Sequence, residues 1–157
     1  MFLRALVAFL LLPGVVAFLV PVAWLWISGA PPPTHPVGLI ILLVGLGALL
    51  VCVRDFRVTG RGSLAPWAPP EKLVTIGLYR SSRNPMYVAV FLILLGWSAT
   101  WDSPGLLVYA FGVAAIFHLR VVYGEEPALA RRFGEEWDEY SGRVPRWFGR
   151  AKPPRTY

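Results

Sequence analysis

The sequence predicts an all-α, polytopic membrane protein with a single domain over residues 1–157. Three observations predict this fold class. Hydrophobic residues make up 56% of the chain and charged residues only 15%, whereas soluble domains carry about 25% charged residues. The apolar residues form four long runs. The charges are confined almost entirely to residues 54–85 and 120–157, which we therefore expect to lie outside the lipid.

The first apolar run, residues 5–27, contains no charge. At about 1.5 Å per residue, a helix of this length crosses a hydrocarbon core of about 30 Å. We expect Pro13 and Pro21 to kink it, which membrane helices tolerate. Arg4 before the run leaves a cleavable signal peptide as the alternative, but the run is long for such a segment and lacks a convincing small-residue cleavage motif.

A proline-rich turn at 31–36 leads into the second run, residues 37–53. Gly38, Gly45 and Gly47 in this run predict close backbone approach to a neighbouring helix. The second run is therefore expected to pack closely inside the bundle.

The third and fourth runs, residues 86–100 and 106–119, are joined by only five residues, Trp101 to Gly105. So short a connection between two helices predicts an antiparallel hairpin. Both runs are short for full spans, so we expect each helix to extend into its polar flank.

Four crossings place both termini on the same side of the membrane. All 15 basic residues fall on that side, in the N-terminal segment, the loop 54–85 and the C-terminal segment 120–157. The positive-inside bias makes this side cytoplasmic. The basic charge is thus read as a topology signal rather than as a nucleic-acid surface, and the Arg-, Ala- and Gly-rich composition favours a bacterial inner membrane.

The small number of sulfur and imidazole side chains excludes several classes of site. One cysteine, Cys52, excludes a disulfide framework and a cysteine-clustered metal site. Two histidines, His35 and His118, exclude the multi-histidine boxes of membrane di-iron enzymes. We expect no resident metal, and Cys52 is expected to be a small apolar filler.

The predicted hairpin brings two polar segments to the same depth. Pro85 lies 18 residues before Ser103 and Glu125 lies 22 residues after it, or about 27 Å and about 33 Å along a helix. The start of the third helix, with Tyr87, is therefore expected beside Glu125 and Glu126 at the cytoplasmic edge. A helix N-terminus favours a carboxylate or phosphate, and the glutamates favour a cation. A zwitterionic or cationic small molecule suits such a place.

The segment after Pro127 predicts an amphipathic helix. Leu129, Phe133, Trp137 and Tyr140 recur at helical spacing, and Gly142 is expected to end the helix. Two interpretations stay open at this point: an anchor on the membrane surface, or a flap that covers the cytoplasmic site.

These residues resemble a known family, the isoprenylcysteine carboxyl methyltransferases and their phospholipid N-methyltransferase relatives. The resemblance covers roughly residues 60–148. Its motif residues, in chain order around the hairpin, are Leu73-Val74-Thr75, Gly77, Tyr79, Arg83-Asn84-Pro85, Tyr87, Glu125-Glu126, Leu129, Phe133-Gly134-Glu135-Glu136, Tyr140 and Arg143-Val144-Pro145.

The resemblance implies an integral membrane enzyme that uses S-adenosylmethionine. It places the cofactor at the cytoplasmic ends of the last two membrane helices. Carried over by position, the cofactor-binding residues are Lys72, Leu73, Val74, Tyr79, Asn84, Pro85, Met86, Tyr87, Glu125 and Glu126. Many relatives have His where this chain has Asn84. The Asn side chain can donate and accept hydrogen bonds, but it neither gains nor loses a proton near neutral pH. We therefore expect no acid–base role at that position.

The resemblance also implies candidate catalytic residues. The arginine that contacts substrate in the family would fall at Val121 in this chain, so the neighbouring Arg120 is the candidate for that role. Glu126 is the candidate general base. The acceptor stays open between an isoprenylcysteine-type carboxylate, a phospholipid amine and another amphipathic molecule entering from the bilayer. Two other classes remain as alternatives, an NADPH-dependent reductase of the steroid-reductase type and a non-catalytic membrane scaffold. The oligomeric state is not predicted.

Overall fold

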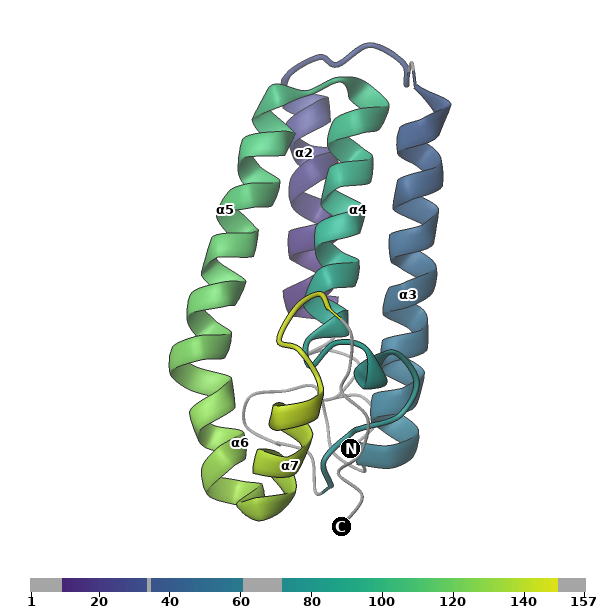
Figure 1. Cartoon of the computed structure of the whole chain (residues 1–157). Coiled ribbons are helices and arrows are strands. Elements are labelled where there is room, and N and C mark those ends of the chain that lie inside the picture. The colour runs from purple at the N-terminus through teal and green to yellow at the C-terminus, as the bar shows by residue number, and fades with distance from the viewer. Residues whose placement is uncertain (1–9, 34, 61–71, 150–157) are drawn as a thin grey trace.

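The computed structural model describes residues 10–33, 35–60 and 72–149, and within these ranges it is helical with no strand. Long helical segments run side by side in a bundle, with shorter helices gathered at one end (Figure 1). In chain order the elements are η1 (Leu10–Leu19), α2 (Val20–Ile27), α3 (Pro36–Gly60), η2 (Gly77–Arg80), α4 (Pro85–Trp101), α5 (Pro104–Arg120), η3 (Val121–Glu125), α6 (Glu126–Phe133) and α7 (Glu135–Arg143).

Two helical stretches in the described part of the chain are long and apolar enough to cross a bilayer, Pro36–Phe56 and Pro104–Phe133. Two more apolar helices, Pro13–Ile27 and Pro85–Trp101, lie beside them but are shorter. The first residues of the predicted span 5–27 lie outside the described residues.

The ends of three helices can be compared with the ranges expected from hydropathy. The second helix does not end at residue 53 but continues to Gly60, so that the connection expected at 54–85 starts later. The fourth extends past 119 into its polar flank as expected, because η3 and α6 prolong it to Phe133, whereas the third, α4, gains only one residue at each end. Charged residues mark where lipid ends, but they do not stop a helix, since its hydrogen bonds continue equally well in water.

Glycines set the closest contact in the bundle, between α3 and α4. A Cβ on Gly45 would lie 2.8 Å from the backbone N of Ile93, and one on Gly38 would collide with the end of α4. Gly96 of α4 meets α3 in the same way. The prediction of close approach is confirmed for Gly38 and Gly45 and is wrong for Gly47, which faces open space.

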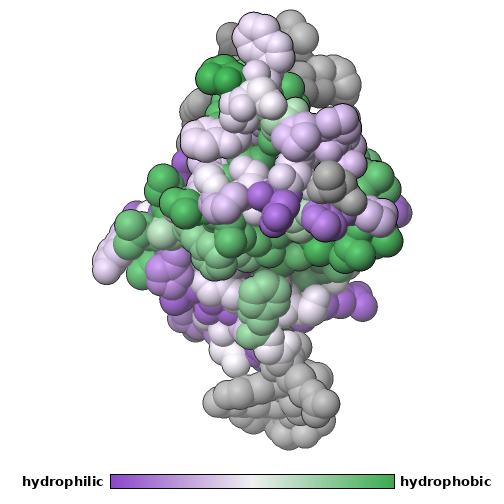
Figure 2. Space-filling model, turned by 90° about the horizontal axis from the view of Figure 1, so that it is seen from above, coloured by the Kyte–Doolittle hydropathy of each residue, from purple (hydrophilic) through white to green (hydrophobic). Residues whose placement is uncertain are grey.

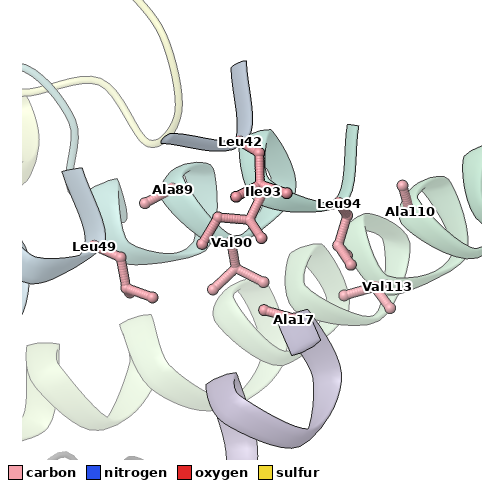
Figure 3. Close-up of a cluster of buried hydrophobic side chains, with 9 residues drawn as sticks. All are labelled: Ala17, Leu42, Leu49, Ala89, Val90, Ile93, Leu94, Ala110 and Val113. Atoms are coloured by element: carbon pink, nitrogen blue, oxygen red, sulfur yellow. The ribbon is translucent and has the colours of Figure 1, made fainter. Parts of the chain in front are cut away.

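A buried apolar cluster joins η1, α3, α4 and α5 (Figure 3). Ala17, Ile93 and Ala110 in it are inaccessible to solvent. The cluster contains both alanines and branched side chains, so the helices pack at the close spacing that the glycines allow. The cluster consists of Ala17, Leu42, Leu49, Ala89, Val90, Ile93, Leu94, Ala110 and Val113.

The turn between α4 and α5 is the tight bend predicted at 101–105. Asp102 ends α4 in the left-handed conformation with φ 45°, and Ser103 caps α5 by accepting a hydrogen bond from the backbone N of Leu106. Pro104 occupies the first turn of α5, where the ring costs no hydrogen bond. The antiparallel hairpin is therefore confirmed.

Large apolar side chains remain exposed on the outside of the bundle. Trp26, Ile27 and Val108 are 85%, 80% and 73% exposed. Viewed from above, hydrophobic atoms lie at the left and right margins of the molecule (Figure 2). An outside of this kind suits contact with lipid chains better than contact with water.

The segment after Pro127 is amphipathic as predicted, but it is two helices rather than one. Gly134 has φ +50°, which takes the chain out of the helical region between α6 and α7. Gly142 does not end the second helix, which runs to Arg143. The expected apolar face still forms, and it packs in one cluster with Leu73 and Val144.

Candidate functional site

The end of the bundle that carries the short helices also carries a cluster of charged and aromatic side chains. Tyr87 lies in the first turn of α4, and Glu125 is the last residue of η3. The Tyr87 hydroxyl donates a hydrogen bond to Glu125 Oε1, and Arg120 Nε donates to the same oxygen at 2.8 Å. The structure thus brings together the two helix ends that the hairpin predicted.

Aromatic rings surround the Tyr87 side chain. The Phe117 ring centroid lies 4.4 Å from that of Tyr87, and the Trp147 centroid lies 6.5 Å away. Trp147 is fixed by a hydrogen bond of 3.1 Å from its Nε1 to His118 Nδ1. In the described part of the chain no three His, Cys, Asp or Glu side chains gather as metal ligands.

The neighbouring carboxylate, Glu126, has different partners. Both of its oxygens accept hydrogen bonds from Arg146, at 2.9 and 2.7 Å, and Arg83 forms an ion pair with it at 3.1 Å. The hydrogen bonds to Glu126 raise the pKa of Arg146. Burial lowers the pKa of Arg83 in spite of the attraction of Glu126, and the Arg83 guanidinium also lies 5.5 Å from the Trp137 ring.

The chain after α7 returns to the loop before α4. The backbone N of Arg83 donates to Pro145 O at 2.9 Å. The carbonyl oxygen of Arg146 accepts from Ser82 Oγ at 3.3 Å and from Asn84 Nδ2 at 3.1 Å. Three consecutive loop residues are thus bound to two consecutive residues of the C-terminal segment, far away in sequence.

The N-terminus of α4 has no side-chain cap. Asn84 is the N-cap residue, with φ −128° and ψ 51°, but its side chain makes no capping hydrogen bond. Pro85 follows in the first turn, where its missing N–H costs nothing. Among the described residues no side chain accepts from the backbone N–H groups of this turn, which suits a bound anion.

The predicted cofactor residues before α4 divide into two groups. Lys72 is exposed. Leu73 and Val74 are buried in hydrophobic clusters, with Trp137 and Cys52 respectively, so their side chains pack rather than face the cluster at Glu125. Tyr79 is buried as well, and Met86 packs against it.

Tyr79 lies in a short turn whose position depends on close contacts. Its backbone oxygen accepts a hydrogen bond of 2.8 Å from the Tyr140 hydroxyl. Burial raises the pKa of both phenols well above the ordinary value. Gly77, two residues earlier, has φ +56°, and the carboxylate of Asp55 occupies the space that a Cβ there would need. Only glycine fits this position.

Sequence reasoning did not assign three residues of this cluster. Arg83 belongs to the motif that carries the resemblance but has no predicted contact, and Arg146 and Trp147 have no predicted role. The signal for Arg83 is its place beside Asn84 in the motif. No local pattern indicates Arg146 or Trp147, because their partners lie 20 and 29 residues away.

Comparison with known proteins gives two matches. A sequence model of the phospholipid methyltransferase family matches residues 33–136 of this chain, from before α3 into α7. The nickel-cobalt-cadmium resistance protein NccN of Alcaligenes xylosoxydans xylosoxydans is 31% identical over 125 residues, which is 80% of this chain. The chain spans about half (53%) of the length of that curated relative. No solved structure matches.

Proposed function

This chain belongs to the phospholipid methyltransferase family, and we propose from that premise that it is an integral membrane methyltransferase. The proposed cofactor is S-adenosylmethionine, and the proposed acceptor is a lipid-like or amphipathic molecule. The observation that supports this best is the meeting of Tyr87 with Glu125 beside an uncapped helix N-terminus. Carboxylate, aromatic rings and free N–H groups together match a ligand with one carboxylate and two cationic centres.

Each part of the cluster has a proposed role. The first turn of α4 and the amide of Asn84 would hold the methionyl carboxylate. Glu125 or Glu126 would hold the amino group, and the Tyr87 ring would lie against the sulfonium through a cation–π contact. The cofactor supplies the reactive methyl group. The protein then contributes orientation, which is worth about 7–11 kcal/mol for well-aligned reactants.

The candidate catalytic residues keep different proposed roles. Arg120 contacts Glu125 and so orients that carboxylate. Both oxygens of Glu126 are bound to Arg146, so Glu126 acts as a base only after this contact opens. An acceptor that arrives as a carboxylate needs no base, whereas an ammonium must first lose a proton. We propose that the acceptor enters from the bilayer and the cofactor from water.

The test of this function uses purified protein, total lipid and radiolabelled S-adenosylmethionine. Transfer of label to lipid or to an added amphipathic acceptor is the expected result. A thermal shift with NADPH alone, without transfer, would support a reductase instead. If neither ligand produces a response, the scaffold interpretation replaces the enzyme.

We further propose four membrane crossings in a bacterial inner membrane, with both termini cytoplasmic. The basic residues at one end of the bundle support this orientation. A cysteine in place of Pro33, at the opposite end, is expected to react with an impermeant maleimide in intact cells. A cysteine in place of Arg131 is expected to react only after permeabilisation. The reverse pattern would contradict the orientation, and the native Cys52 is fully buried.

A further inference from the structure

The segment Val144–Gly149, here called the strap, crosses the end of the bundle where the candidate site lies. In Figure 1 it is the yellow chain that rises from α7 in front of the lower end of α4. Its backbone is bound to Ser82, Arg83 and Asn84, as described above. The strap is therefore attached to the loop that leads into the N-terminus of α4.

Two side chains of the strap contact the candidate site directly. Arg146 forms a two-pronged contact with Glu126, whose side chain is only 13% exposed. Trp147 lies beside Tyr87 and is bound to His118 of α5. The strap thus links the loop, α5 and α6 across the Tyr87–Glu125 pair.

The strap forms hydrogen bonds with two side chains that the proposed function assigns to cofactor binding, those of Glu126 and Asn84. The guanidinium of Arg146 takes both oxygens of Glu126, as a ligand ammonium would. The carbonyl of Arg146 takes the amide hydrogen of Asn84, as a ligand carboxylate would. One residue therefore stands in for the positive and the negative group of a zwitterion.

We propose that Arg146 is a latch, which holds the strap closed and competes with a cationic ligand for Glu126. This inference rests on the proposed function for the identity of the ligand, but not for the closure itself. In the closed form the site is filled from within the chain. Ligand binding then requires that Arg146 leave Glu126, and the measured affinity equals the affinity of the open form multiplied by the fraction of molecules that are open.

The latch is of moderate strength. The Arg146 side chain is 35% exposed, so water screens its attraction to Glu126. We expect removal of the latch to tighten ligand binding about tenfold, which corresponds to about 1.4 kcal/mol. A latch of this strength opens readily on ligand binding but stays closed most of the time without it.

The experiment compares three variants of the full-length protein in detergent. Arg146→Gln removes the charge, and Arg146→Lys keeps the charge without the two-pronged contact. Arg143→Gln is the matched control, because it removes the same charge just before the strap from an arginine that pairs with Glu139 rather than with Glu126. Equilibrium binding of radiolabelled S-adenosylmethionine is measured, together with hydrogen–deuterium exchange of the Arg83 amide, which Pro145 O protects.

The expected result is about tenfold tighter binding and about tenfold faster Arg83 exchange in Arg146→Gln, with a smaller change in Arg146→Lys and none in Arg143→Gln. Binding by Arg146→Gln that is unchanged or weaker overturns the latch. If no variant binds S-adenosylmethionine, the proposed function fails. Hydrogen–deuterium exchange of the Arg83 amide then tests the latch by itself. Faster exchange then supports it, and unchanged exchange overturns it.

Discussion

Replacement of Glu125 by Gln is expected to weaken the binding of S-adenosylmethionine much more than it lowers the free energy of unfolding. The substitution keeps the shape of the side chain and removes its charge. The Tyr87 hydroxyl still has an oxygen to which it donates, and Arg120, 40% exposed, is left facing water. The lost ion pair is half-exposed on both sides, so we expect the free energy of unfolding to fall by at most about 1 kcal/mol.

The expected loss of binding is larger than the loss of stability. A hydrogen bond from a ligand ammonium to a carboxylate is worth about 1.5–3 kcal/mol, because the charge strengthens it. Its loss weakens the binding of S-adenosylmethionine about ten- to hundredfold. Isothermal titration calorimetry of the purified protein measures the Kd, and thermal unfolding of the same sample measures stability.

Glu139→Gln is the control for this comparison, because Glu139 forms an exposed i,i+4 pair on α7. We expect it to change neither binding nor unfolding temperature. A Glu125→Gln protein that binds as tightly as the parent would refute the assignment of Glu125 to the cofactor. A large drop in the unfolding temperature of Glu125→Gln would instead show that the Glu125 carboxylate stabilises the folded structure.

Two further predictions concern packing and pH. Gly45→Ala places a methyl group against the Ile93 backbone and is expected to cost about 1–3 kcal/mol in thermal unfolding, whereas Gly47→Ala, in open space, is expected to be neutral or stabilising. Burial raises the pKa of Tyr79 and Tyr140 in the folded protein. Their contribution to the free energy of unfolding is therefore fully present below about pH 10, and it is lost at higher pH, where the two tyrosines ionise in the unfolded chain. Tyr140→Phe is expected to make this alkaline loss less steep by about 1.4 kcal/mol per pH unit, and an unchanged slope would contradict the burial argument.

The sequence predicts those parts of this molecule that follow from constant helix geometry. The meeting of Tyr87 and Glu125 follows from a tight turn and a fixed rise per residue, so the sequence alone predicts it. The break between α6 and α7 at Gly134 is not predicted, because the apolar period of α6 continues into α7 as if the helix were unbroken. The contact of Arg146 with Glu126 joins residues 20 positions apart across that break, so no helical period predicts it either.

The two adjacent glutamates serve different parts of the structure. Consecutive residues of a helix point about 100° apart, so they do not share a face. Glu125 accordingly contacts Tyr87 and Arg120 of the hairpin, while Glu126 contacts the loop and the strap. The π-helical turn η3 ends at Glu125, and single π-helical turns within α-helices frequently occur at functional sites. A ligand bound between the two carboxylates would therefore touch the membrane hairpin on one side and the strap on the other, which couples its binding to the opening of the latch.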